Sequence, residues 1–138
     1  MRYVLDACAL LAFLNKEDGW EKVRGLLTEA VDSGDTQVCM NSVNLLEVYY
    51  DRLRLDNAFK LGEFLMCAFE SPIRIIDTFP RPLLDEAARI KAFYRRVSLA
   101  DAIGIATAFC AGGIFVTSDH HELDAVNARE AVRFLWIR

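Results

Sequence analysis

Four acidic residues stand in apolar surroundings that give them no obvious reason to be charged. Asp6 follows the short apolar run "RYVL", and Asp119 follows "IFVTS" in the same way. Glu47 and Asp101 interrupt the apolar stretches "NSVNLLEVYY" and "SLADAIGIATAF". Burying a carboxylate without a partner is costly, and many apolar residues would serve a purely structural purpose better. These positions therefore suggest a cleft or a partner that is distant in the sequence.

Four carboxylates that converge repel one another, and they stay ionised together only beside a cation. A set of ligands made of oxygen alone selects hard ions, of which Mg²⁺ and Mn²⁺ are the candidates. Such ions activate water and stabilise the leaving oxygen when a phosphodiester is hydrolysed. The sequence shows no evident nucleophile or general-base histidine, because the adjacent His120 and His121 at a helix start are expected to face solvent. Metal-assisted phosphodiester hydrolysis is the chemistry that these acids predict.

A purely structural role is the competing interpretation of each acid taken alone. Acids in the first turn of a helix oppose the macrodipole, and Asp101 stands three residues after Ser98, as in a capping box. Capping explains the positions one at a time but not their shared placement in a fold. Both interpretations stay open until the elements that carry the acids are considered.

Short β-prone runs alternate with amphipathic helical runs along the 138 residues. Strands are expected at "RYVLD", "TQVCMNS", "IRIID", "IFVTSD" and "RFLWI". Helices are expected at "ALLAFLN", "GWEKVRGLLTEAVDSG", "VNLLEVYYDRLRL", "NAFKLGEFLMCAF", "RPLLDEAARIKAFYRR" and "SLADAIGIATAFCAGG", the last with Ser98 as its N-cap. The pattern predicts one α/β domain over residues 1–138, with a mostly parallel sheet of about five strands and helices on both faces.

Parallel sheets of this kind bind ligands beyond the carboxyl ends of their strands. Asp6, taken as the last residue of the first strand, and Asp119, after the "IFVTS" strand, are both expected at that edge. Glu47 and Asp101 are expected near the beginnings of their helices. The fold thus predicts that all four acids meet in one cleft.

The formal net charge of −4 argues against binding nucleic acid through the whole surface, but it permits a local basic patch. The candidates for contacts with an RNA backbone are basic residues on two helices, although solvated helix surface is the alternative: Lys91, Arg95, Arg96, Arg52 and Arg54. Two aromatic pairs fit either base stacking or packing: Tyr49-Tyr50 and Phe93-Tyr94.

The cysteines indicate a reducing cytoplasm. They stand alone in apolar segments, without metal-ligand spacing or a secretory leader, and are expected to be reduced core thiols: Cys8, Cys39, Cys67 and Cys110. The run "ACALLAFL" has no small-residue cleavage site after it, and Gly112-Gly113 divides the uncharged stretch from Ala102 to Ser118. Neither segment predicts a contact with a membrane.

In these motifs the sequence resembles the PIN-domain nucleases and, within them, the VapC-like ribonuclease toxins of prokaryotic toxin-antitoxin pairs. "YVLDACALLAFL", "NSVNLLEV", "SLADAIGIATA" and "FVTSDHHEL" match the four acidic motifs of that family in order. The resemblance implies that Asp6, Glu47, Asp101 and Asp119 are catalytic and hold Mg²⁺ or Mn²⁺, with the Thr117 hydroxyl supporting them. Cys8 is a departure, because the family more often has a serine or threonine there, and a thiol is a poorer hydrogen-bond partner.

The resemblance also implies a metal-dependent endoribonuclease with an RNA substrate and a cognate antitoxin as partners. The helices from Leu45 to Phe69 carry more apolar residues than one buried face needs, which predicts a homodimer and a groove for an antitoxin segment. One alternative is another small Mg²⁺-dependent phosphohydrolase, although "LDACAL" lacks the second aspartate of such phosphatases. The other is a binding module, either a PIN fold that does not cleave or a receiver-like acidic pocket.

Overall fold

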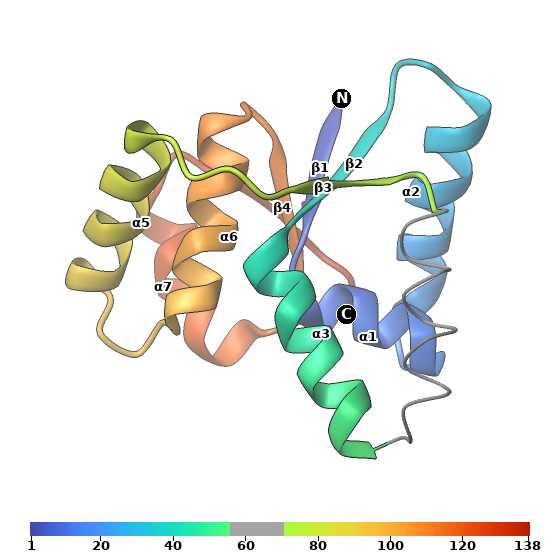
Figure 1. Cartoon of the computed structure of the whole chain (residues 1–138), viewed down its shortest axis with the longest axis horizontal. Coiled ribbons are helices and arrows are strands. Elements are labelled where there is room, and N and C mark those ends of the chain that lie inside the picture. The colour runs from blue at the N-terminus through green and yellow to red at the C-terminus, as the bar shows by residue number, and fades with distance from the viewer. Residues whose placement is uncertain (56–70) are drawn as a thin grey trace.

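The computed structural model describes residues 1–55 and 71–138, and these form a sheet with helices on either side (Figure 1). The strands are β1 (Arg2–Leu5), β2 (Gln37–Asn41), β3 (Ile73–Ile76), β4 (Ile114–Thr117) and β5 (Arg133–Trp136). The helices are α1 (Ala7–Asn15), α2 (Trp20–Asp32), α3 (Ser42–Leu55), α5 (Arg81–Phe93), α6 (Leu99–Cys110) and α7 (His120–Arg129). The helix expected at "NAFKLGEFLMCAF" lies outside the described residues.

The five strands lie in the order β3-β2-β1-β4-β5, and every neighbouring pair is parallel. The central strand is β1, whose Val4 is paired with Cys39 on one side and with Phe115 on the other. The chain builds the sheet outwards from β1 to β3 and then returns to the opposite side of β1 for β4. This change of direction makes the carboxyl ends of β1 and its neighbours the topological switch point, which is where such sheets bind ligands.

Side chains that alternate along the strands give the sheet an apolar surface on both faces. Leu5 belongs to a core with α1, α2 and α3, and Val4 belongs to a second core with α5, α6 and α7. Figure 1 shows α5, α6 and α7 on one side of the strands, and α1 and α2 on the other. The prediction of an α/β fold with helices on both faces of the sheet is confirmed, and the sheet is entirely parallel.

Two expectations need correction. First, β1 ends at Leu5, and Asp6 is the N-cap of α1, because its side chain turns back to accept a hydrogen bond from the helix. Second, Cys8 and Cys110 are exposed residues, and of the described cysteines only Cys39 is in a core. Cys67 lies outside the described residues. None of the described helices is both long and apolar enough to cross a membrane.

Candidate metal centre

Asp6 is the most deeply buried of the acids, with 1% of its surface exposed. The Ala9 amide donates a hydrogen bond of 2.7 Å to its Oδ1, whereas its Oδ2 accepts none from the described residues. Burial raises the pKa of Asp6 to about 7, opposed by the Thr117 hydroxyl and the Ala9 amide, and the charges of Asp101 and Glu47 raise it further. A buried carboxylate with one oxygen left over is suited to bind a cation.

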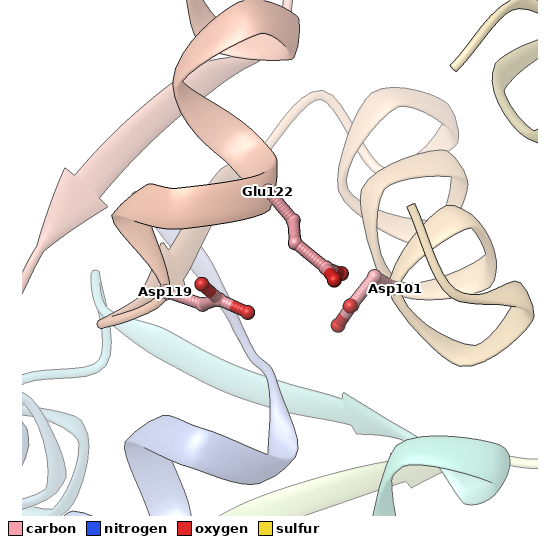
Figure 2. Close-up of side chains that lie close together, drawn as sticks. All are labelled: Asp101, Asp119 and Glu122. Atoms are coloured by element: carbon pink, nitrogen blue, oxygen red, sulfur yellow. The ribbon is translucent and has the colours of Figure 1, made fainter. Parts of the chain in front are cut away.

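Asp101, Asp119 and Glu122 form a cluster whose ligand oxygens all lie within 4.8 Å of one another. Figure 2 shows the three carboxylates turned towards a common point, with Asp101 from α6 and Glu122 from α7. Asp119 comes just before α7, as its N-cap residue. All three side chains are partly buried, so solvent and ions reach them.

A capping box holds Asp101 in the cluster. The Ser98 hydroxyl donates to Asp101 Oδ2 at 2.8 Å, and the Asp101 amide donates to Ser98 Oγ at 3.0 Å. Burial raises the pKa of Asp101, as do the charges of Asp119 and Glu122, while the Ser98 hydroxyl lowers it. The capping role predicted for Asp101 is thus present. It is compatible with a place in the cluster, because the same hydrogen bonds hold the carboxylate there.

Thr117, the last residue of β4, connects Asp6 with Asp119. Its fully buried Oγ1 accepts a hydrogen bond of 3.1 Å from the Asp119 amide, and its hydroxyl lowers the pKa of Asp6. The Asp6 amide in turn donates to the Val116 carbonyl at 3.0 Å. The carboxyl ends of β1 and β4 are therefore fixed relative to each other, together with the acids that follow them.

Glu47 faces the cluster from α3. Burial raises its pKa, the charge of Asp101 raises it further, and the Asn44 side chain lowers it through a hydrogen bond. Asn44 also ties α3 to the start of α6, because its Nδ2 donates to the Ala100 carbonyl at 3.1 Å. A Cβ at Gly104 would lie 2.9 Å from Asn44 Oδ1 and 2.8 Å from the Phe115 ring, so the absence of a side chain lets α6 approach both neighbours.

The structure brings the four acids predicted from the sequence to the same edge of the sheet. Asp101 and Asp119 belong to the close cluster, and Asp6 and Glu47 interact with Asp101 through its charge. Sequence reasoning misses Glu122, although it stands three residues after Asp119 at the start of a helix, the same spacing as Ser98 and Asp101. At that spacing the sequence indicates only an acid that caps the start of α7. The contact of Glu122 with Asp101 depends on the packing of α6 against α7, which the sequence does not show.

Cys8 also lies close to the acids. Burial raises the pKa of its thiol to about 12, and the charges of Asp6, Asp101, Asp119 and Glu47 contribute. Without a bound ion the thiol is therefore protonated at neutral pH, and a protonated thiol is a poor nucleophile.

The two histidines are exposed, as predicted. The His120 ring stacks on Trp136 with a centroid distance of 3.9 Å, and its two nitrogens bond to Asp124 and to the Arg138 carbonyl. Both ring nitrogens of His120 are therefore occupied by other partners. The donors that the cluster offers are carboxylate oxygens, and the unpartnered Asp6 Oδ2 is another; this donor set fits Mg²⁺ or Mn²⁺.

Comparison with known proteins places this chain in a family. The profile of the PIN domain matches residues 3–128. The solved structure titled DNA-bound VapBC from Salmonella typhimurium is 18% identical, with a TM-score of 0.72 over 100% of this chain and 99% of that one. VapBC2 from Rickettsia felis, bound to a DNA fragment from its promoter, is 16% identical, with a TM-score of 0.72 over 98% of each chain.

A toxin-antitoxin complex from Klebsiella pneumoniae is 12% identical, with a TM-score of 0.70 over 99% of this chain and 98% of that one. No curated protein matches the sequence significantly. At these identities the structural matches show a shared fold, whereas the profile covers most of the chain. The predicted resemblance is confirmed at that level, and the chain belongs to the PIN-domain family of nucleases.

Proposed function

We propose that this protein is a metal-dependent endoribonuclease that hydrolyses RNA phosphodiester bonds and is the toxin of a toxin-antitoxin pair. The observation that carries the proposal is the close cluster of Asp101, Asp119 and Glu122. The charge of Asp101 also acts on Asp6, whose Oδ2 is buried without a hydrogen-bond partner among the described residues. Helix capping explains the position of Asp101, but it does not explain why acids from different elements lie close together. Membership in the PIN-domain family supports the same chemistry.

The ligands proposed for Mg²⁺ or Mn²⁺ are the four acids predicted from the sequence, with Glu122 added: Asp6, Glu47, Asp101, Asp119 and Glu122. When bound, the ion supplies Lewis acidity, which polarises the phosphate and offsets charge on the leaving oxygen. The capping bonds of Asp6 and Asp101 hold their carboxylates in place before the ion arrives. Thr117 acts as a positioning residue, because it fixes the backbone of Asp119.

The alternatives are less well supported. A phosphatase that works through an aspartyl nucleophile places a second aspartate two residues after the first, where this chain has Cys8 with a thiol pKa of about 12. A protein that only binds RNA has no use for a cluster of carboxylates, because carboxylates repel phosphates. Hydrolysis with a bound cation resolves that conflict.

The antitoxin and the homodimer are proposals about the surface of α3. Leu46, Tyr50 and Leu53 are 60%, 63% and 57% exposed, and their spacing places them on one face of the helix. The matched solved structures from Salmonella typhimurium and Rickettsia felis are VapBC complexes, which supports a protein partner for the present chain. Sedimentation at about 10 μM, an order-of-magnitude concentration for a weak dimer, tests the homodimer. A strict monomer would contradict it.

The domain and the compartment are proposed on the same basis. The PIN domain is taken to extend over residues 1–138, because β5 lies beyond the family match and still pairs with β4. A reducing cytoplasm is proposed as the location, since Cys8, Cys39 and Cys110 are free thiols.

Cleavage of structured RNA by the purified chain, with Mn²⁺ or with chelator, tests the function. We expect cleavage only with the ion, and its loss in Asp101→Asn, which removes a charge at almost constant volume. The matched control is Asp77→Asn, because Asp77 also follows a strand directly but lies exposed beyond the edge strand β3. Cleavage by Asp101→Asn at the wild-type rate would refute the assignment, as would equal losses in both variants.

A further inference from the structure

A hollow of about 410 Å³ lies beside the metal centre. One wall is the segment 93–97, which leads out of α5, and the other is a face of α7 made by His121, Glu122 and Ala125. This volume falls within the range of about 300 to 1,000 Å³ that is typical of sites for small ligands. Of the described residues that line this hollow, only Glu122 belongs to the proposed metal centre.

The hollow and the metal centre share a boundary. Glu122 lines the hollow and belongs to the cluster with Asp101 and Asp119. The segment 93–97 continues directly into Ser98, whose hydroxyl holds Asp101. A polymer with its reacting bond at the acids would therefore extend into the hollow with an adjoining unit.

The segment 93–97 is fixed by hydrogen bonds. Lys91 Nζ donates to the Arg95 carbonyl at 2.9 Å and to the Val97 carbonyl at 2.8 Å. The Val97 amide donates to the Tyr94 carbonyl at 3.1 Å, and the Tyr94 hydroxyl donates to Glu130 at 2.8 Å. The ammonium of Lys91 therefore holds the turn and is not available to contact RNA. Arg95 and Arg96 are the basic residues of this segment that remain as candidates for that contact.

Arg95 and Arg96 are exposed, and neither forms an ion pair with a carboxylate in the part of the chain that the structure describes. Arg89 differs, because Glu86 and Glu130 hold its guanidinium at 2.7 and 2.6 Å. Two positive charges on neighbouring exposed residues of a fixed turn attract an anion. Guanidinium groups are matched in geometry to phosphate oxygens.

The hollow also offers an aromatic surface. Phe93 is 69% exposed, and its ring lies 5.4 Å from the largely buried Tyr94 ring at an interplanar angle of 58°. A single exposed phenylalanine needs no explanation. A phenylalanine beside two arginines on one turn, however, is the combination that stacks bases and holds phosphates of single-stranded nucleic acids.

We propose that this hollow binds the nucleotide next to the scissile phosphate of a single-stranded RNA. Arg95 and Arg96 hold the phosphate of that nucleotide, and Phe93 stacks on its base. The inference rests on the proposed function. It adds that the RNA substrate is single-stranded and that it reaches the metal centre through this hollow. The phosphate charge lies on the arginine side, and Glu122 forms the opposite wall towards the metal centre.

Binding is measured by fluorescence anisotropy in the Asp101→Asn background, with a short, labelled single-stranded RNA of mixed sequence. Arg95→Gln combined with Arg96→Gln is expected to weaken binding and to make the slope of log K against log salt less steep by about 0.7, the value for the one phosphate that they hold. Arg24→Gln with Arg74→Gln, which removes two charges from α2 and β3, is the matched control and should leave the slope unchanged. Arg95→Lys with Arg96→Lys should restore the slope, because the charge returns.

Phe93→Ala tests the stacking part. We expect about a tenfold loss of affinity, near the lower end of what a stacked base contributes, and near-complete retention in Phe93→Tyr. An RNA backbone without bases should bind Phe93→Ala and the parent protein equally well. Melting temperatures of the Arg95, Arg96 and Phe93 variants should equal that of the parent, because these side chains are exposed and leave the turn intact.

Two results would overturn the inference: an unchanged salt slope after loss of both arginines, or duplex RNA that competes as well as the single strand. Cleavage by the wild-type chain separates this inference from the proposed function. Metal-dependent cleavage with an unchanged salt slope refutes the hollow alone. Loss of slope in a chain that never cleaves supports the hollow as an RNA site and refutes the nuclease.

Discussion

Asp6→Asn is expected to stabilise the metal-free protein above neutral pH. The pKa of Asp6 is about 7 in the folded chain, against a reference value of 3.8. Between these values the folded chain binds more protons than the unfolded one, so the contribution of Asp6 to stability is greatest below pH 3.8 and is lost as the pH rises through 7. Burial also raises the pKa of Asp101 and Glu47, which adds to the same trend.

The size of the effect follows from that interval. At about 1.4 kcal/mol per pH unit, the span from 3.8 to about 7 corresponds to a penalty of about 4 kcal/mol for ionised Asp6. The carboxamide introduced by the substitution can still accept from the Ala9 N–H, but its buried NH₂ group lacks an acceptor where Oδ2 stood, which costs about 1 to 3 kcal/mol. The net gain is about 1 to 3 kcal/mol, or roughly 3 to 10 °C in melting temperature for a domain of this size.

Thermal melts of wild type and Asp6→Asn at pH 8 and pH 4, each with chelator and with Mn²⁺, test this reasoning. The variant should melt higher with chelator at pH 8, and its advantage should vanish at pH 4. The ion should stabilise the wild type by about 2.7 kcal/mol at 100 times its dissociation constant, and the variant by less. A variant that melts lower than the wild type at pH 8, together with a wild type that does not respond to Mn²⁺, would mean that the acids do not share a site.

Three further predictions address other parts of the structure. Glu122→Gln should reduce the Mn²⁺-induced rise in melting temperature, whereas a rise equal to that of the wild type would remove Glu122 from the metal centre. Gly104→Ala should destabilise the chain by about 1 to 3 kcal/mol in urea unfolding, because the new Cβ would clash with Phe115 and Asn44. Gly25→Ala on α2 is the control, because its Cβ would meet nothing within 4 Å and should stabilise the chain slightly. Equal effects of the two substitutions would contradict the close approach of α6. Cys8 and Cys110 are both exposed and burial raises both thiol pKa values, but four acids act on Cys8 and its pKa is about 12, so iodoacetamide at pH 8 should modify Cys110 faster; mass spectrometry of the two peptides that shows the reverse order would contradict this.

The fold could be predicted from the sequence because the strands have a recognisable pattern. Runs such as "IFVT" are apolar on both faces, which is typical of a parallel sheet between two helical layers. The positions of acids after such runs then follow from topology alone, so Asp6 and Asp119 could be predicted together. Ser98 could be predicted as a cap because capping depends on neighbours in the sequence.

What could not be predicted depends on contacts between distant elements. Glu122 has the local pattern of a capping acid, and its partner Asp101 lies on another helix. Cys8 and Cys110 stand in apolar segments, but the packing of their helices leaves both residues exposed. The role of Lys91 was also hidden, because a lysine that holds two carbonyls has the same sequence signature as one that faces a ligand.

The central position of β1 has a consequence for how the protein comes into being. Leu5 pairs with Val116, so β1 needs a partner strand that is synthesised after β2 and β3. Contacts of such long separation form late and slow the folding of a domain. Asp6 is synthesised before the acids of the cluster, and it has no cluster to join until β4 and α7 have been made. A partly synthesised chain that lacks α7 therefore carries no assembled acidic site.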